Sequence, residues 1–366
     1  MRRGMSARLP ARPGLRIGFV LPGLGVGGAE RIVTHLALDL AARGHACWVA
    51  ATTRGGLRAR ELQRHGVPVE VLGLNDPSRG LRAAGRLRQW MADHRLDVVH
   101  SHLSPADILT AWARASLRPR PRWVATLHNP GVELSRRRWA VWAASLRLGA
   151  WVTAVGDAVA RAAPVPVARV IRPSSFDPTA VAPSRLQARR ALKLRSTRPW
   201  ILFVGRLAVV KGVDRIEKLA ARVPGASFAV VGDGPEGPAL ARAGVHAWGS
   251  RAAPERLLPA ANLLLLPSRS EGFPQILLEA AAARVPVVAT ATAGTCEILT
   301  PDTGYLTPLG PEPQVLSGLE RAIRTALADP VDARARADRA RARVLAEGWT
   351  RRAMVDRFER LFRDGV

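Results

Sequence analysis

Short apolar runs alternate with amphipathic segments along almost the whole chain. In the first half, seven runs predict strands: "LRIGFVLP", "CWVAAT", "VPVEVLGL", "LDVVHSH", "RWVATLH", "AWVTAV" and "VARVIRP". In the second half, five runs do so: "WILFVGRL", "ASFAVVGDG", "VHAWG", "NLLLLPSR" and "VPVVATA". Because these strands are continuously apolar and separated by helical patterns, they predict parallel sheets with helices on both faces.

The chain divides into two such sections. Its 366 residues are many for one domain and suit two. The segment 173–199 lacks a clean strand pattern and contains several prolines, so we interpret it as a linker between domains 15–172 and 200–346. Two doubly wound domains that face each other across a cleft would place a ligand at the carboxyl ends of their strands.

The N-terminus is similar to a secretory signal peptide, with basic, apolar and small residues in that order. Pro22 and several glycines interrupt its apolar part, which favours a strand and loop instead. We expect residues 1–14 to be a disordered basic tail.

Cys47 and Cys296 match no metal or redox spacing, and no apolar run reaches the roughly 18 residues of a membrane helix. These features predict a cytoplasmic protein.

The net charge of +26 indicates an anionic partner, either nucleic acid or membrane. Only three of the 55 basic residues are lysines, and such an arginine bias also follows from a GC-rich genome. The excess is concentrated in residues 1–172, which carry a net +17, against +9 in the remainder. No nucleic-acid-binding motif is evident, and one tyrosine with seven phenylalanines offers few stacking groups. We therefore expect no nucleic-acid partner.

One segment of the first half concentrates this charge. Between Arg114 and Arg147 lie eight arginines and one acid, Glu133. Trp139, Trp142 and Leu146 recur there at helical spacing after arginines 136–138. Such a helix is typical of proteins that lie on anionic membrane surfaces. The same apolar residues are equally those of a helix packed on the first sheet.

A glycine-rich turn follows the first strand. The sequence "LPGLGVGGAER" predicts a helix that begins at Glu30, and Gly27 and Gly28 would let backbone amides approach a phosphate. The spacing is not that of the dinucleotide fingerprint, so a plain strand-to-helix turn explains it as well.

Two cations follow the first strand of the second half. Arg206 and Lys211 in "VGRLAVVKG" suit a diphosphate, with Arg as a fork and Lys as a point charge. Solvated surface charges are the alternative, but Lys211 is one of only three lysines in the chain.

Two carboxylates stand eight positions apart in "PSRSEGFPQILLEAAAARVPVVAT". Glu271 falls in a loop, where it would accept hydrogen bonds from sugar hydroxyls. Pro274 suits the first turn of the following helix, whose N-terminal amides, at Phe273 to Ile276, suit an anion. Glu279 lies within an otherwise apolar run, so we expect it to bind a ribose rather than face solvent.

Together these motifs resemble a known family. The residues "GGAER", "VGRL…KG", "GDGP", "SEGFPQILLEAAAARVPVVAT" and "GTCEIL" are similar to those of family-4 retaining glycosyltransferases with the GT-B fold. The resemblance runs from about Leu15 to the last helix, and the E-x7-E element of Glu271 and Glu279 is its most specific part.

The resemblance implies two Rossmann-like domains, the first for the acceptor and the second for the donor. It implies that Arg206 and Lys211 hold the donor diphosphate, that Glu279 binds the ribose, and that Glu271 binds the transferred sugar. Amides around Gly272, Phe273, Pro274 and Gln275 would support the sugar and phosphate. His128, in "TLHN", matches the histidine that lines the sugar site, although it is equally compatible with a structural role.

The family also implies that a C-terminal helix, within residues 347–366, crosses back to the first domain. Trp349, Met354, Phe358 and Leu361 have helical spacing there. Two departures stand out: residues 173–177 read "PSSFD" where the family commonly has P-N-G-V-D, and the segment between "GDGP" and "VHAWG" is short. Because of the second departure, the motifs do not identify the donor.

The predicted function is transfer of a hexose or N-acetylhexosamine from a nucleotide-diphosphate sugar, with UDP favoured over GDP. The acceptor would be a glycan or lipid-linked molecule in bacterial cell-surface polysaccharide or lipopolysaccharide synthesis. No Asp-x-Asp sequence occurs, so we expect neither a metal nor a cofactor. The alternatives are a sugar-nucleotide epimerase of the same fold, a nucleic-acid-binding protein and a non-catalytic scaffold.

Overall fold

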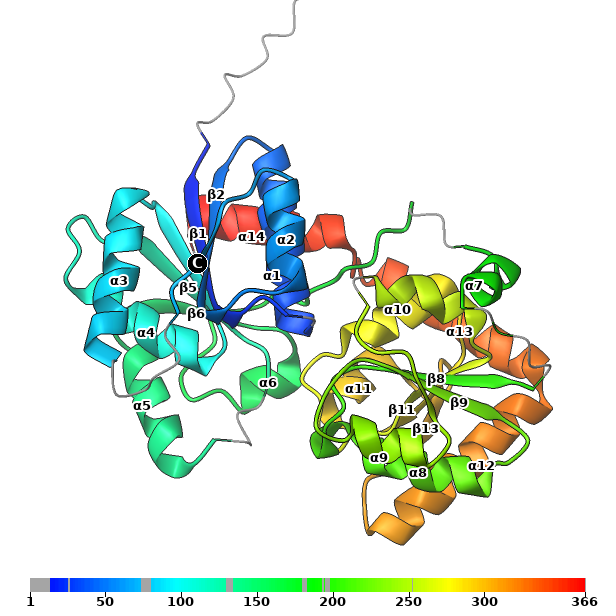
Figure 1. Ribbon diagram of the computed structural model, residues 1–366. Coiled ribbons are helices and arrows are strands. Elements are labelled where there is room, and N and C mark those ends of the chain that lie inside the picture. The colour runs from blue at the N-terminus through cyan, green and yellow to red at the C-terminus, as the bar shows by residue number, and fades with distance from the viewer. Residues whose placement is uncertain are drawn as a thin grey trace, which may run out of the picture.

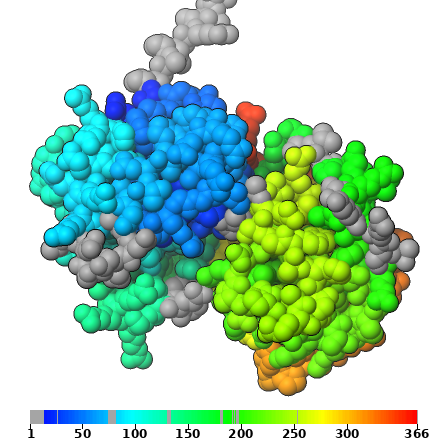
Figure 2. Space-filling model, viewed as in Figure 1, coloured from blue at the N-terminus to red at the C-terminus, as the bar shows by residue number. Residues whose placement is uncertain are grey.

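The structure is a computed structural model that describes residues 14–25, 27–73, 80–129, 134–179, 183–192, 194, 198–251 and 253–365. The expected tail, apart from Gly14, lies outside these ranges. Two α/β domains lie side by side (Figure 1), and Figure 2 shows them as two lobes that touch. Within the described ranges, no helix combines the length and apolarity needed to cross a membrane.

The first domain contains a seven-stranded parallel sheet, in the order β3-β2-β1-β4-β5-β6-β7. Its strands are β1 (Arg16–Gly23), β2 (Ala46–Arg54), β3 (Val69–Val71), β4 (Val98–His102), β5 (Arg122–Leu127), β6 (Ala150–Ala154) and β7 (Arg169–Val170). Each of the seven predicted runs contributes one strand. The strand order reverses between β1 and β4, which is where open α/β sheets bind ligands.

Helices pack on both faces of this sheet. They are α1 (Gly28–Ala42), α2 (Leu57–Arg64), α3 (Gly80–Asp93), α4 (Ser104–Ala115), α5 (Arg136–Leu146) and α6 (Asp157–Arg161). The first begins at Gly28, two residues before the predicted Glu30, because Gly27 already takes the extended N-cap conformation.

The second domain contains a six-stranded parallel sheet, in the order β10-β9-β8-β11-β12-β13. Its strands are β8 (Trp200–Val204), β9 (Ser227–Val231), β10 (His246–Ala247), β11 (Leu263–Leu266), β12 (Val287–Thr290) and β13 (Tyr305–Thr307). The last was not predicted, since its three residues include only one aliphatic side chain.

The helical elements of this domain are η2 (Val209–Lys211), α8 (Val213–Arg222), α9 (Gly237–Arg242), η3 (Pro254–Ala260), α10 (Gln275–Ala283), α11 (Ala293–Ile298), α12 (Glu312–Ala328) and α13 (Pro330–Ala346). The segment between the sheets contains a further helix, α7 (Arg185–Ala191). Ser184 and Gln187 form a capping box at its start. Seven residues are too few for a clear helical period, so the sequence pattern did not reveal it.

The last helix, α14 (Arg351–Asp364), returns to the first domain, as expected for the family (Figure 1). Met354, Phe358 and Leu361 are buried in a core that also includes Leu36 and Leu40 of α1. Arg351 donates two hydrogen bonds, of 2.7 and 2.5 Å, to the carboxylate of Asp39. Together with the two sheets, this crossing confirms the GT-B architecture.

Trp349 does not belong to the buried face of α14. It precedes the helix and packs edge-on against Phe273, with 5.6 Å between ring centroids. The end of the chain is therefore attached to the second domain immediately before it crosses to the first.

We predict that Phe358→Ala destabilises the protein by about 3–5 kcal/mol, because it removes a fully buried ring from the contact between α14 and the first sheet. Chemical denaturation measures the change. The exposed Arg360→Ala, on the same helix, is the control and should cost less than about 0.5 kcal/mol. Equal effects of the two substitutions would contradict the proposed packing role of α14.

Candidate functional site

One cation and one acid predicted to bind a donor, Lys211 and Glu271, come together at the carboxyl edge of the second sheet. Gly212, which ends η2, has a φ of 69° and lies so close to Pro267 that a Cβ atom would come 1.9 Å from its carbonyl oxygen. A glycine therefore lets η2 pack against the loop that follows β11. This packing places Lys211 Nζ 2.7 Å from Glu271 Oε2.

Glu271 is buried, and hydrogen bonds hold its carboxylate in place. Its second oxygen, Oε1, accepts a hydrogen bond of 2.6 Å from Ser268 Oγ. The loop is fixed in turn by Thr290, whose hydroxyl donates to the Ser268 carbonyl at 2.5 Å. Each carboxylate oxygen still has a lone pair, and Lys211 keeps two N–H groups for other acceptors. The pair can therefore bind a hydroxyl and an anion at the same time.

The N-terminus of α10 lies directly after this loop, and no side chain caps it. Its free amides make it a favourable position for an anion. The prediction concerned the backbone amides of this segment, and two of its side chains contact other parts of the protein: Gln275 Nε2 donates to the Pro173 carbonyl at 2.9 Å, and Phe273 packs on Trp349. Gln275 Oε1 is buried without a partner among the described residues.

Glu279 is buried and bridges three parts of the chain. Its Oε1 accepts hydrogen bonds from Arg31 of α1 and, at 2.7 Å, from Ser175 of the linker. Its Oε2 is buried without a partner among the described residues. Burial raises the pKa of Glu279, and Arg31 opposes that shift.

Arg31 connects the two domains at this point. It is itself buried, and it donates to Glu255 as well as to Glu279, both in the second domain. Burial acts to lower the pKa of Arg31, but the two carboxylates outweigh it and raise the pKa. The guanidinium therefore stays charged between two acids.

The glycines at the start of α1 are less suited to a phosphate than expected. A Cβ atom on Gly27 would come 2.0 Å from Glu30 Oε2, so the Glu30 carboxylate already lies beside this turn. Burial raises the pKa of Glu30, while the charges of Arg54 and Arg206 are among the influences that lower it. A carboxylate next to Gly27 and Gly28 repels an anion there, unless Glu30 is protonated.

The Arg206 side chain is exposed and has no hydrogen bond or ion pair with the described residues, although its carbonyl accepts a hydrogen bond from the Ala208 amide. Its charge acts on Glu30 across the domain boundary, which places its guanidinium near the start of α1. This cation is therefore free to bind a ligand between the domains.

His128 belongs to a group of three histidines at the carboxyl ends of β4 and β5. His128 Nε2 lies 2.8 Å from His102 Nδ1, and the His102 ring lies 4.1 Å from that of His100. Burial lowers the pKa of His128 to about 4, so its imidazole is neutral at pH 7. A neutral imidazole can hydrogen-bond a sugar hydroxyl but cannot act as a fixed cation.

The domains approach each other closely at this histidine. A Cβ atom on Gly272 would come 2.1 Å from the His128 carbonyl oxygen, so any other residue would push the domains apart. The loop that carries Glu271 therefore faces His128 directly.

Sequence reasoning missed several residues at this boundary. Arg31 lies in the quoted "GGAER", and Glu297, in "GTCEIL", accepts hydrogen bonds of 2.9 and 2.6 Å from the amides of Asp157 and Ala158. Ser175, Ser268 and Glu255 gave no sequence signal. Within the described ranges, no group of three or more His, Cys, Asp or Glu side chains is placed to hold a metal.

Two family models match the chain, one in each domain. Residues 26–164 match the family described as Glycosyltransferase Family 4, and residues 198–329 match Glycosyl transferases group 1. Among curated proteins, a D-inositol 3-phosphate glycosyltransferase of Mycolicibacterium paratuberculosis is 36% identical over 126 residues. That match covers 30% of this chain and only 28% of the relative.

Solved structures match over nearly the full length. HepE from Anabaena, in complex with UDP and glucose, has a TM-score of 0.82 at 23% identity, with 96% of this chain and 100% of that chain covered. WaaG, a glycosyltransferase involved in lipopolysaccharide biosynthesis, has a TM-score of 0.74 at 20% identity, over 95% and 100% of the two chains. At such identities the likeness shows the fold.

The group of histidines at the ends of β4 and β5 predicts a loss of stability in acid. Because the pKa of His128 is lowered to about 4, the unfolded chain binds a proton near pH 6.5 that the folded chain does not. The free energy of unfolding should therefore fall as the pH decreases from 7 to 5. Urea denaturation at both pH values should show a smaller decrease for His128→Asn than for wild type, and an unchanged decrease for the exposed His246→Asn. An equal decrease in all three proteins would contradict this assignment.

Proposed function

Because this chain belongs to the glycosyltransferases that join a family 4 domain to a group 1 domain in a GT-B fold, we propose that it is a retaining hexosyltransferase. It transfers a hexose or N-acetylhexosamine from a nucleotide-diphosphate sugar to a glycan or lipid-linked acceptor of cell-surface polysaccharide or lipopolysaccharide synthesis. The observation that carries the proposal is the Lys211–Glu271 pair beside the uncapped N-terminus of α10.

The donor diphosphate binds three positive groups that follow the carboxyl ends of β8 and β11. Lys211 has two unused N–H groups, Arg206 has no partner among the described residues, and the α10 amides point out of the helix end. HepE, a protein of similar fold, was crystallised with UDP-glucose, which supports UDP as the donor nucleotide. The transferred sugar then lies beside Glu271, whose oxygens accept its hydroxyl hydrogens.

The ribose binds at Glu279, which requires a change in the boundary between the domains. Arg31 and Ser175 occupy Oε1, and Oε2 is closed off from solvent. A nucleoside gains access when Arg31 moves away from Glu279, and its ribose hydroxyls then replace the guanidinium as hydrogen-bond donors. We infer that donor entry is coupled to separation of the domains at Arg31.

The reaction is a displacement in which the acceptor attacks the same face of the sugar that the diphosphate leaves. The bond between the anomeric carbon and the diphosphate oxygen breaks, and its electron pair stays with the diphosphate. The acceptor oxygen attacks the anomeric carbon, and its proton passes to the departing oxygen. Arg206, Lys211 and the α10 terminus stabilise the charge that develops on the diphosphate. The neutral imidazole of His128 hydrogen-bonds the sugar.

The first domain binds the acceptor and contacts an anionic membrane. The apolar residues of α5 divide into buried and exposed ones. Trp142 and Leu146 are buried, as expected for a helix packed on the first sheet, but Trp139 is 39% exposed. Val141 at 45% and Leu148 at 57% are also exposed, close in sequence to the exposed arginines 136–138 and 147. Trp112 of α4 is 57% exposed. Exposed tryptophan and leucine among arginines suit a headgroup region.

Glu271→Gln and Lys211→Ala should each reduce transfer by about tenfold to a hundredfold, roughly 1.4–3 kcal/mol, because each removes a group that contacts the donor in the transition state. Nucleotide release from a panel of nucleotide sugars, with and without candidate acceptors, measures the effect. The exposed Glu217→Gln and Lys218→Ala, on α8, are matched controls that should keep wild-type rates. Near-normal transfer by a folded Lys211→Ala protein would refute the site, and conversion of the donor without an acceptor would favour an epimerase.

With Arg206 and Lys211 as the charge clamp, we expect transfer to be independent of metal. Excess EDTA should leave the rate largely unchanged in the same assay. Loss of activity that returns with Mg²⁺ or Mn²⁺ would show that the cations do not suffice.

The protein should sediment with anionic liposomes but not with neutral ones, and about 0.5 M salt should release it, because the Debye length is then a few ångströms. Replacing Arg136, Arg137 and Arg138 with Ser should weaken binding, since each arginine near the surface contributes about 1 kcal/mol. Serine at the exposed Arg242, Arg251 and Arg256 of the second domain removes the same charge and should change little. Equal effects of the two triple variants would contradict the assigned surface.

A further inference from the structure

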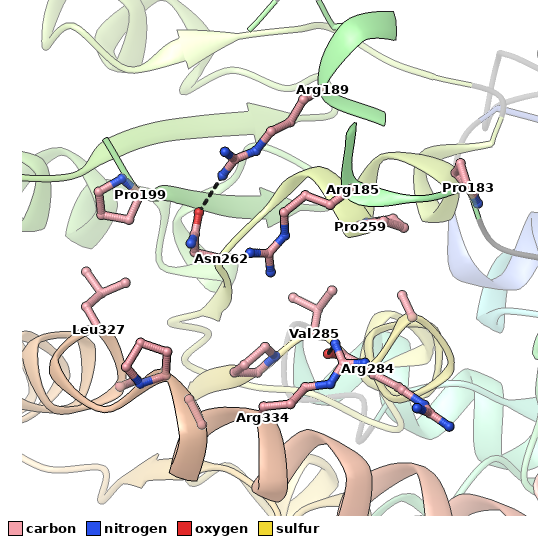
Figure 3. Close-up of a pocket in the computed structure, with 15 residues that line it drawn as sticks. Pro183, Arg185, Arg189, Pro199, Pro259, Asn262, Arg284, Val285, Leu327 and Arg334 are labelled. Carbon is pink, nitrogen blue, oxygen red and sulfur yellow. Dashed lines mark hydrogen bonds between the residues drawn. The ribbon is translucent and has the colours of Figure 1, made fainter. Parts of the chain in front are cut away.

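A pocket of about 770 Å³ lies between α7 of the linker and the second domain, away from the residues of the proposed donor site (Figure 3). Its volume falls within the range of small-molecule sites. Four arginines line it: Arg185, Arg189, Arg284 and Arg334. Prolines and aliphatic side chains form most of the remaining wall.

The pocket and the proposed donor site lie at opposite edges of the second sheet. Pro199, Asn262 and Pro286, which line the pocket, immediately precede β8, β11 and β12. Lys211 and Glu271 instead follow the carboxyl ends of β8 and β11. Five residues of β8 span about 16 Å at roughly 3.3 Å per residue, so the pocket is a separate site.

Two of its arginines are held in place by neutral acceptors. Arg189 donates to the Ala260 carbonyl at 3.0 Å and to Asn262 Oδ1 at 2.8 Å, and Arg185 donates to the Ala261 carbonyl at 3.5 Å. Neither has an ion pair with a described carboxylate. Figure 3 shows the Arg185 side chain directed into the space between α7 and α13.

The other two arginines share a single acid. Asp338 lies 3.4 Å from Arg284 and 3.6 Å from Arg334, and all three side chains are about half exposed. Four guanidinium groups thus face one pocket with one carboxylate among the described residues. Burial, and then the charges of Arg189 and Arg334, lower the pKa of Arg185, which indicates uncompensated repulsion.

We propose that this pocket binds a small organic phosphate or diphosphate. The planar guanidinium fork matches phosphate oxygens in a bidentate geometry, and an anion with two or more charges relieves the repulsion among the arginines. The proline and aliphatic walls contact the organic part of the ligand. The phosphate belongs either to a soluble metabolite or to a lipid headgroup.

Calorimetric titration with inorganic diphosphate tests the site. The parent protein carries Arg206→Ala and Lys211→Ala, so that the donor site does not bind the probe. Adding Arg185→Gln and Arg334→Gln should weaken binding at least tenfold. Adding Arg242→Gln and Arg251→Gln, two exposed arginines of the same domain, removes equal charge and should leave the affinity within about twofold of the parent.

A thermal unfolding measurement separates loss of the ligand from loss of the fold. Without ligand, the Arg185→Gln, Arg334→Gln protein should melt at the parent temperature or above, since it has less repulsion. Diphosphate should raise the melting temperature of the parent and of the control variant but not of this protein.

Vesicles of phosphatidylcholine, with and without 20% phosphatidic acid, identify the source of the phosphate. Binding of diphosphate that depends on Arg185 and Arg334 indicates a soluble ligand, and vesicle binding that depends on them indicates a lipid headgroup. No response to either probe in the parent, or equal responses in the parent and the Arg185→Gln, Arg334→Gln protein, would overturn the proposal.

Discussion

The burial of two carboxylates, Glu271 and Glu279, is the constraint on which the arrangement of the two domains depends. A charged carboxylate removed from water costs several kcal/mol unless cations and hydrogen-bond donors replace the solvent. Glu271 finds its cation, Lys211, within its own domain. Glu279 finds Arg31 only in the other domain and Ser175 in the linker, so its partners exist only when the domains are in contact.

This difference assigns different roles to the two acids. The contacts of Glu271 with Lys211 and Ser268 lie within the second domain, so separation of the domains would leave them intact. In the proposed function, the Lys211–Glu271 pair is therefore a preformed contact for a sugar and a phosphate. In the proposed function, the Arg31–Glu279 contact breaks before a nucleoside enters, and the ribose then replaces the guanidinium. Glu297, which binds the amides at the start of α6, is another contact that separation would break, whereas α14 stays packed on the first domain.

Much of the fold followed from the sequence because continuous apolar strands, glycine turns and helical spacing are local signals. The short β13 and α7 lack such signals, and only pairing with β12 and the Ser184 cap reveal them. The E-x7-E spacing placed Glu271 in a loop and Glu279 in the helix that follows it. No local pattern reveals that Glu279 pairs with Arg31, because the two residues are 248 positions apart in the sequence. The backbone amides of Phe273 and Gln275 were predicted at the site, but the contacts of their side chains with Trp349 and the linker could not be predicted, since packing rather than spacing decides where a side chain points.

In the proposed function, one nucleotide-diphosphate sugar contacts Arg206, Lys211, Glu271 and Glu279 at the same time. A crystal structure with a bound UDP-sugar tests it most directly. We expect the diphosphate between Arg206, Lys211 and the N-terminus of α10, the sugar beside Glu271, and the ribose at Glu279 in place of the Arg31 guanidinium. A nucleotide bound elsewhere, or one bound while Arg31 still contacts Glu279, would contradict this account.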